Sequence, residues 1–173
     1  MENTLSIRQS TPDDYAILKE IIDLSFPMFF RYFAIRSVTS EDGKVLVSET
    51  QGDVSGFVKL IEFKSGSRKY GCILWIAVHP SYRRRGIALR LTNAGIDYLK
   101  NDGSQAVFAS TQTRNKAAQA TLGKAGFRLV GFLSLWRVLV GECLVFTVIF
   151  GMHQPKSFSS TILKKLIGRE SRI

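Results

Sequence analysis

The sequence predicts an α/β fold of the α+β kind, with a mixed and mostly antiparallel central sheet. Two observations predict it. Several short β-type runs follow one another through tight turns, which is typical of antiparallel strands. Later, one apolar run leads through an amphipathic helix into another, which is typical of a parallel pair. The chain has 173 residues, 45% of them hydrophobic, and this is enough for one compact core.

The amino-terminal part predicts one strand and two helices. A strand begins at Ile7. Thr11 and Pro12 then start a helix, because they supply a hydroxyl N-cap and a proline at the first helical position. Pro27 opens a second stretch, which is rich in aromatic residues. Apolar residues at helical spacing predict the buried face of the first helix: Ile17, Leu18, Ile21, Ile22 and Leu24.

The middle of the chain predicts three strands. Residues 44–49 and 54–63 form two of them, joined at Gln51-Gly52-Asp53, which is a hairpin turn signal. A polar turn over residues 64–69 precedes the third strand, over residues 70–78. These three runs supply the antiparallel part of the sheet.

A βαβ segment and a further helix follow. The amphipathic helix covers residues 87–100, the strand residues 106–110 and the second helix residues 115–125. Gly126 ends that helix in the favoured C′ position. The expected order along the chain is therefore β-α-α-β-β-β-α-β-α-β-β.

Residues 129–150 are apolar enough to raise the possibility of a membrane span. Arg137 and Glu142 interrupt the run, whereas a membrane-spanning helix needs about 20 nearly uncharged residues. The Val, Leu, Phe and Trp content favours a β-hairpin over residues 127–150 instead, so no transmembrane segment is predicted.

The carboxyl-terminal residues are basic. Ser160 is a candidate cap for a short helix there, and its apolar residues would be Ile162, Leu163, Leu166 and Ile167. A helix docked on the domain, a frayed end and a surface anchor are the alternatives for this segment. We expect one domain over residues 1–155 and a basic tail over residues 156–173.

Charge and cysteine content narrow the class of protein. Residues 1–62 hold 10 of the 14 acidic and 6 of the 24 basic residues, for a net −4, and residues 63–173 carry net +14. The positive half attracts anionic ligands, nucleic acid included. Cys72 and Cys143 lie in apolar runs without metal-ligand spacing. The sequence shows no signal peptide, so the two cysteines predict buried thiols in a reduced, cytoplasmic protein. Their spacing predicts no metal site.

The segment from Val78 to Ala88 carries the clearest functional pattern. A strand ends there in an arginine run and a glycine, directly before a helix. A helix N-terminus has unpaired backbone N–H groups and a partial positive charge, which together bind phosphate. Gly86 and Ala88 add little bulk, so Arg83-x-x-Gly86-x-Ala88 predicts a pyrophosphate site. The Walker A and dinucleotide glycine patterns are absent, and a charged loop or a basic import-type cluster is the alternative.

This spacing resembles the acetyl-CoA motif of the GCN5-related N-acetyltransferase (GNAT) family, Arg/Gln-x-x-Gly-x-Gly/Ala. The same family commonly shows Asn-x-x-Ala-x-x-Leu-Tyr-x-Lys-x-Gly-Phe further along. The chain matches that second motif at Asn115, Ala118, Lys124, Gly126 and Phe127. The two motifs occur in the family's order, and the resemblance covers about residues 5–150.

The resemblance implies the acyl-CoA N-acyltransferase (GNAT) fold, in which the parallel strands splay apart around acetyl-CoA. Acetyl-CoA would be a cosubstrate, its pantetheine arm paired with a strand backbone and its pyrophosphate held by the turn amides and arginines. The residues implied in binding it are Ile76, Ala77, Val78, Arg83, Arg84, Arg85, Gly86, Ile87, Ala88, Asn115, Ala118 and Leu122.

The catalytic residues are less clear. The family's tyrosine, the usual proton donor to the departing sulfur, falls on Leu122, so the general acid is unassigned. Family members often carry a carboxylate base on the central strand, but residues 70–78 contain none. Glu62 and His79 are the candidates for the base; a solvated edge carboxylate and a loop histidine facing water are the alternative readings.

The resemblance implies an acetyl-CoA-dependent N-acetyltransferase, monomeric or homodimeric, in which a primary amine attacks the thioester directly. The acceptor is not identified. Phe29, Phe30 and Tyr32 lie in a segment that often lines the acceptor site in this family, and helix packing is their alternative role. Two other classes stay open. The missing tyrosine suggests a non-catalytic CoA-binding sensor or regulatory protein, and the basic half suggests a nucleic-acid-binding domain, which the paired motifs make the less favoured.

Overall fold

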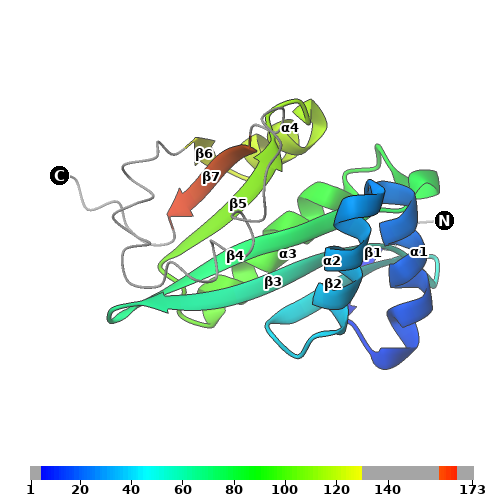
Figure 1. The fold of residues 1–173 in the computed structure, drawn as a ribbon, viewed down its shortest axis with the longest axis horizontal. Coiled ribbons are helices and arrows are strands. Elements are labelled where there is room, and N and C mark those ends of the chain that lie inside the picture. Colours follow the sequence, from blue (N-terminus) through cyan, green and yellow to red (C-terminus); the bar gives the residue numbers. More distant parts are fainter. Residues whose placement is uncertain (1–4, 130–159, 167–173) are drawn as a thin grey trace. The chain divides into compact units, whose positions relative to one another are not determined.

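A computed structural model describes residues 5–129 and 160–166 (Figure 1). The chain divides into two compact units: Met1–Ile61 with Ile73–Tyr98, and Glu62–Cys72 with Leu99–Ile173. Strands β3 (Asp53–Ser65) and β4 (Arg68–Val78) and helix α3 (Ile87–Asn101) each contribute to both units.

The first unit begins with antiparallel strands. β1 (Leu5–Gln9) pairs along its length with β2 (Lys44–Thr50), which in turn pairs with β3. The turn between β2 and β3 has φ of 57° at Gln51 and 90° at Gly52. Positive φ at both central residues is the signature of a type I′ turn, so the predicted hairpin is confirmed.

Two helices cover one face of these strands. A 3₁₀ turn, capped by Thr11 and opened by Pro12, leads into α1 (Tyr15–Ser25), and α2 (Met28–Thr39) follows. The predicted buried face is wrong at Leu24, which is 52% exposed, because Leu18, Ile21 and Ile22 form the centre of the buried face and Leu24 lies beyond its edge. The helices and strands share a core of Leu18, Ile21, Ile22, Ala34, Val45, Val47, Phe57 and Ala77.

Helix α3 covers the opposite face of β3. Successive side chains of a strand point to opposite faces, and Phe57 belongs to the core under α1 and α2. At Gly56, a Cβ atom would lie 3.2 Å from Leu91 Cδ1 of α3. In Figure 1, α2 accordingly lies in front of the strands and α3 behind them. The amphipathic helix predicted over residues 87–100 is confirmed.

The second unit contains β5 (Ala106–Gln112), α4 (Lys116–Lys124), β6 (Arg128–Leu129) and β7 (Ser160–Leu166). β7 lies between β5 and β6 and pairs antiparallel with both. The helix predicted from Ser160 is therefore wrong. The backbone of this segment pairs with β5 over all of its seven residues, and such long-range pairing overrides the helical spacing of the apolar residues.

The remaining predictions have mixed outcomes. The mixed, mostly antiparallel fold class with one parallel pair is confirmed. Gly126 has φ of 85° after α4, as a C′ glycine should. Cys72 is buried, and burial raises the pKa of its thiol to about 12. Other predictions lie outside the described residues: most of the hairpin over residues 127–150, the buried thiol of Cys143 and the domain boundary at residue 155. In the described part of the chain, no helix combines the length and apolar character needed to cross a membrane.

Candidate active site

The turn from β4 to α3 is built from main-chain contacts within the first unit. β4 ends at Val78, and the backbone N–H of His79 donates to Ser55 O over 2.9 Å. A 3₁₀ turn at Pro80–Tyr82 follows, and α3 begins at Ile87, whose side chain is buried. The strand end and the helix start are thus fixed, and the arginine run lies between them.

Arg83 holds this turn in place. Its Nε donates to Val78 O over 3.0 Å, and its Nη2 donates to Ser25 Oγ over 3.1 Å. One guanidinium therefore joins the end of β4 to the end of α1. The sequence predicts that Arg83 adds positive charge to a phosphate site; its contacts give it a positioning role as well.

Gly86 and Arg84 have the backbone conformation of a tight turn. Their φ angles are 77° and 63°. A Cβ atom added to Gly86 would meet no heavy atom within 4 Å, so the space beside this glycine is open. A ligand can approach the backbone closely at such a point.

The start of α3 presents backbone donors beside Gly86. The N–H of Arg90 donates to Gly86 O over 3.1 Å and begins the α-helical hydrogen bonding. The amides of Ile87 and Ala88 precede it, and amides in the first turn of a helix have no intrahelical acceptor. These donors, the open space and the exposed Arg84 and Arg85 suit an anionic group such as a pyrophosphate.

Tyr82 supports the arginine run. Arg85 Cζ lies 5.4 Å from the centre of the Tyr82 ring, within the range of a cation–π contact. The Tyr82 hydroxyl donates to Asp53 Oδ2 over 3.1 Å, and this hydrogen bond raises the pKa of Tyr82. Asp53 and Tyr82 are far apart in sequence, so no local signal pointed to this pair.

The strand residues predicted to pair with the pantetheine arm lie at the end of β4. Ala77 and Val78 are buried, and Ile76 is half-buried. On the β3 side, a Cβ atom at Gly56 would lie 2.8 Å from Ala77 O. The close approach of β3 to this part of β4 therefore needs a glycine.

His79, one of the two candidate bases, has its Nδ1 occupied by a hydrogen bond. Its Nδ1 accepts from the backbone N–H of Ser81 over 3.3 Å, and its Nε2 lies 3.7 Å from Glu20 Oε1 on α1. When Nδ1 accepts a hydrogen bond, the neutral ring carries its proton on Nε2. These contacts favour a role in holding the turn to α1 over proton abstraction.

Glu62, the other candidate base, lies in the second unit. Its Oε2 is 2.7 Å from Lys69 Nζ, which also contacts Asp102. Burial and the neighbouring Asp102 raise the pKa of Glu62, while Lys69 opposes this change. A carboxylate with a raised pKa can take up a proton at higher pH, so the role of base stays a prediction.

Helix α4 carries the predicted residues of the second motif, also in the second unit. Asn115 is its N-cap: Oδ1 accepts from the N–H of Ala118 over 3.1 Å. Ala118 is half-buried, and Leu122 is 4% exposed. The predicted residues thus fall into two groups, one at the β4–α3 turn of the first unit and one on α4 of the second.

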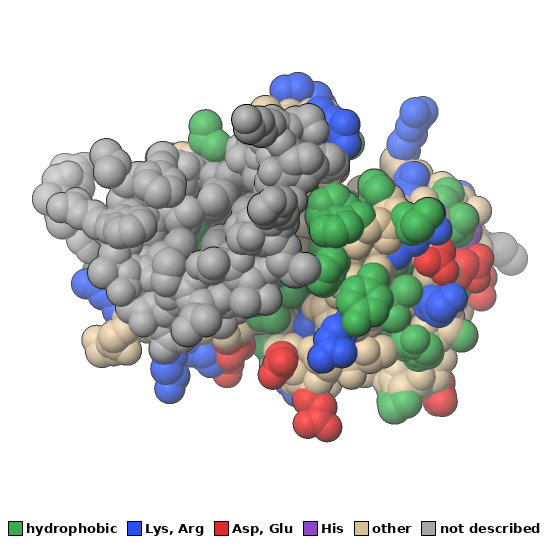
Figure 2. Space-filling view, viewed as in Figure 1, with side chains coloured by type: hydrophobic (Ala, Val, Ile, Leu, Met, Phe, Trp, Pro, Cys, Tyr) green, Lys and Arg blue, Asp and Glu red, His purple; other side chains and the backbone are tan. Residues whose placement is uncertain are grey.

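An aromatic cluster covers β4 within the first unit. Trp75 packs edge-on against Phe26, with ring centres 5.3 Å apart, and against Phe30. The Trp75 Nε1 atom is buried and has no hydrogen-bond partner among the described residues. Phe29 and Tyr32 on α2 are 59% and 64% exposed, and Figure 2 shows hydrophobic side chains gathered on this face. Phe30 packs on Trp75, while Phe29 and Tyr32 each contact the Phe33 ring and are still largely exposed.

The chain is similar in sequence to known acetyltransferases. The model of the Acetyltransferase (GNAT) family matches residues 8–127. N-alpha-acetyltransferase 30 of Schizosaccharomyces pombe is 37% identical over 62 residues, which are 36% of this chain and 41% of that protein. GCN5-related N-acetyltransferase 6, chloroplastic, of Arabidopsis thaliana is 31% identical over 67 residues, 39% of this chain and 23% of that protein. The match spans less than half the length of these curated relatives.

Solved structures show the same fold. A GNAT-family protein of Desulfovibrio desulfuricans has a TM-score of 0.74 at 14% identity, covering 94% of this chain and 99% of that chain. NAA60 of Arabidopsis thaliana, in complex with acetyl-CoA, has a TM-score of 0.70 at 20% identity, covering 95% and 100%. The family model covers more than half of this chain and includes both the β4–α3 turn and α4. The chain therefore belongs to the GNAT acetyltransferase family.

Proposed function

We propose that this protein transfers the acetyl group of acetyl-CoA to a primary amine of an unidentified acceptor. The observation that carries the proposal is the β4–α3 turn, where first-turn amides, a glycine with open space beside it and two exposed arginines occur together. Family membership favours acetyl-CoA over other anions with a phosphate group.

The turn would hold the pyrophosphate. Amides of Arg84 to Ala88 would donate to its oxygens, and Arg84 and Arg85 would add positive charge. The Arg83 contacts keep the turn at the end of β4, so that the bound group and the strand have a fixed spacing. From there the pantetheine arm would run along the backbone of Ile76 to Val78.

Acetyl-CoA supplies the acetyl group as a thioester, and the protein places an amine against it. The attacking amine must be neutral, because an ammonium with a pKa near 10 has no lone pair. Backbone N–H groups of β4 would stabilise the negative charge that develops on the carbonyl oxygen. The thiolate of coenzyme A, with a pKa of about 8.5, is a fair leaving group without a protein acid. No covalent intermediate on the enzyme is needed.

The acid and base remain the open part of this mechanism. Leu122 occupies the family's tyrosine position and cannot donate a proton, so water or another group would protonate the thiolate. Glu62 has a raised pKa but is paired with Lys69, and His79 is held by Ser81 and Glu20. Turnover is therefore expected to depend strongly on the neutral fraction of the acceptor amine.

A thiol-release assay tests this function. The full chain is supplied with acetyl-CoA and a panel of small amines, polyamines and peptides with free amino termini. An enzyme should release free coenzyme A with at least one amine class, and acetyl-CoA alone should raise its melting temperature. Failure to bind acetyl-CoA would overturn the proposal.

The same experiment separates the alternatives. A CoA-binding sensor should be stabilised by acetyl-CoA but release no thiol with any amine. The missing tyrosine is the observation that keeps this alternative open. A nucleic-acid-binding protein should ignore acetyl-CoA and bind nucleic acid with a steep dependence on salt.

A further inference from the structure

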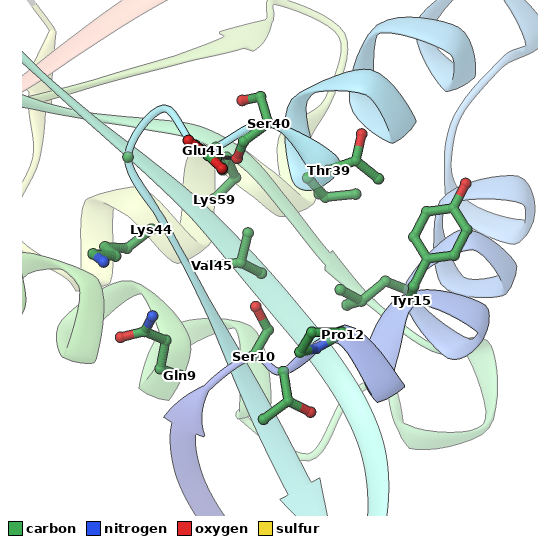
Figure 3. Close-up of a pocket in the computed structure, with 14 residues that line it drawn as sticks. Gln9, Ser10, Pro12, Tyr15, Thr39, Ser40, Glu41, Lys44, Val45 and Lys59 are labelled. Atoms are coloured by element: carbon green, nitrogen blue, oxygen red, sulfur yellow. Dashed lines mark hydrogen bonds between the residues drawn. The ribbon is translucent and has the colours of Figure 1, made fainter.

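A second candidate site lies in the first unit, on the α1–α2 side of the strands. It is a cavity of about 660 Å³, surrounded by the end of β1, the start of α1, the end of α2 and the start of β2 (Figure 3). Its described lining residues include none from the β4–α3 turn. The volume is in the range of small-molecule sites.

A buried lysine lines this cavity. Lys59 lies on β3 opposite Val45 of β2, and its side chain is 1% exposed. Its Nζ donates to Ser40 O over 3.3 Å, a long hydrogen bond, whereas an ammonium has three N–H donors. Among the described residues, no carboxylate lies within ion-pair distance of Nζ. Burial lowers the pKa of Lys59, and the charge of Asp42 opposes this change.

A glycine lets the loop over Lys59 lie close against β3. Gly43 in this loop has φ of 72°, and a Cβ atom there would collide with the carbonyl oxygen of Leu60 on β3. The glycine thus allows the loop between α2 and β2 to lie directly against β3. This contact brings Ser40 to the buried lysine, and the cavity wall is a formed surface.

The other lining residues define the kind of ligand that fits. Leu18, Val38 and Val45 supply apolar walls, and in Figure 3 Tyr15 and Lys44 lie on opposite sides of Val45. Lys44 is exposed, so its ammonium is already solvated. Glu41 also lines the cavity and disfavours a ligand with two negative charges.

We propose that this cavity binds a small organic carboxylate with a single negative charge. Its carboxylate would accept hydrogen bonds from Lys59 Nζ, and its short apolar body would pack against Leu18, Val38 and Val45. A buried ammonium is poorly solvated, so a charge-assisted hydrogen bond to an anion stabilises it more than at the surface. The site does not depend on the proposed acetyl transfer.

Calorimetric titration of the full chain tests the site. The probes are butyrate, hexanoate and benzoate, each compared with its neutral amide. Wild-type protein should bind at least one carboxylate at least about tenfold more tightly than the matching amide. Lys59→Met, which removes the ammonium and keeps an unbranched side chain only one atom shorter, should weaken that binding at least about tenfold, and Lys44→Met should change it less than about threefold. Lys59→Met should fold, because a buried unpaired charge is removed.

A second measurement applies if Lys59→Met does not fold. The Lys59 side-chain nitrogen of wild-type protein is titrated by NMR with and without the carboxylate. Bound carboxylate should raise the pKa of Lys59, because a nearby negative charge favours the ammonium. The proposal is overturned if the pKa of Lys59 stays unchanged or if the carboxylate and its amide bind equally well. It is also overturned if Lys59→Met binds the carboxylate as tightly as wild type, or if wild type does not bind it at millimolar concentration.

Discussion

At the scale of single residues, Asp14 is a buried carboxylate held by several hydrogen bonds. It is 6% exposed, and its oxygens accept from Arg8 Nη1 and Nη2 over 2.7 and 2.9 Å. It also accepts from the backbone N–H of Thr11 over 2.7 Å. The Arg8 hydrogen bonds lower the pKa of Asp14 to about 2. The start of α1 is thereby tied to β1.

Asp14→Asn should therefore lower the free energy of unfolding at neutral pH by roughly 1–3 kcal/mol, since it leaves Arg8 and Thr11 poorly satisfied. Because its pKa is lowered, ionised Asp14 adds its full contribution to the free energy of unfolding above pH 3.8, and this contribution is lost as the pH falls through about 2. Urea unfolding of wild type and Asp14→Asn over this pH range measures the contribution. Asp13→Asn, an exposed neighbour, is the control and should change stability by less than about 0.5 kcal/mol. If the difference in free energy of unfolding between Asp14→Asn and wild type stayed constant down to the lowest pH, the lowered pKa of Asp14 would be contradicted.

Leu122 is the residue on which the family's tyrosine falls in the proposed alignment. If it occupies the family's tyrosine position, Leu122→Tyr supplies a phenol to the departing thiolate and should raise turnover by about tenfold or more with any accepted amine. Affinity for acetyl-CoA should stay nearly unchanged. Thr121→Tyr is the matched control and should not raise turnover. Because Leu122 is buried, the melting temperature of each variant is measured as well. Unchanged turnover in a folded Leu122→Tyr protein would show that this position is not near sulfur.

At the scale of elements, glycines set how closely β3 can pack. A Cβ atom at Gly56 would lie 2.8 Å from Ala77 O and 3.2 Å from Val78 Cα. Both neighbours are backbone atoms, which cannot rotate away. Gly123 in α4 differs, because a Cβ atom there would meet nothing within 4 Å.

Gly56→Ala should accordingly destabilise the protein by about 1–3 kcal/mol through overpacking. Gly123→Ala should stabilise it by about 0.4–1 kcal/mol, because alanine lowers the entropy of the unfolded chain and favours the helix. Urea unfolding of the two variants beside wild type gives both values. If both substitutions change the free energy of unfolding in the same direction, this account of β3 packing is contradicted.

The elements whose signals are local could be predicted from the sequence. Gln51-Gly52-Asp53 predicts its turn because Gly52 accommodates positive φ, and Thr11-Pro12 predicts the start of the first helix through N-capping. Ser160–Leu166 could not be predicted this way. Its spacing fits a helix, and only pairing with β5, far earlier in the chain, makes it a strand.

The candidate site also has a part with local sequence signals and a part that depends on contacts between distant residues. The arginine-glycine turn is a contiguous motif and could be predicted, whereas the hydrogen bond from the Ala118 N–H to Asn115 Oδ1 comes from the structure. The contacts of Arg83 with Ser25 and of Tyr82 with Asp53 join residues far apart in sequence. The cavity at Lys59 likewise depends on a loop that lies against β3, and no local sequence signal predicts that contact.

At the scale of the whole molecule, charge and motif act together. The excess positive charge lies on residues 63–173, which include the β4–α3 turn and α4. Such a field raises the association rate of an anionic cosubstrate, and added salt screens it. Charge alone does not select acetyl-CoA over nucleic acid. Family membership favours acetyl-CoA, and the open backbone at Gly86 is where its pyrophosphate would bind.

Calorimetric titration of acetyl-CoA into wild type, Gly86→Glu and Gly103→Glu tests this most directly. Gly86 and Gly103 have φ of 77° and 87°, and a Cβ atom at either would meet nothing within 4 Å. The two variants therefore share the same backbone strain and the same added charge, at opposite ends of α3. Gly86→Glu should weaken acetyl-CoA binding at least about hundredfold, while Gly103→Glu should stay within about threefold of wild type. Equal binding by a folded Gly86→Glu protein, or equal loss in both variants, would contradict the assignment of the turn as the acetyl-CoA site.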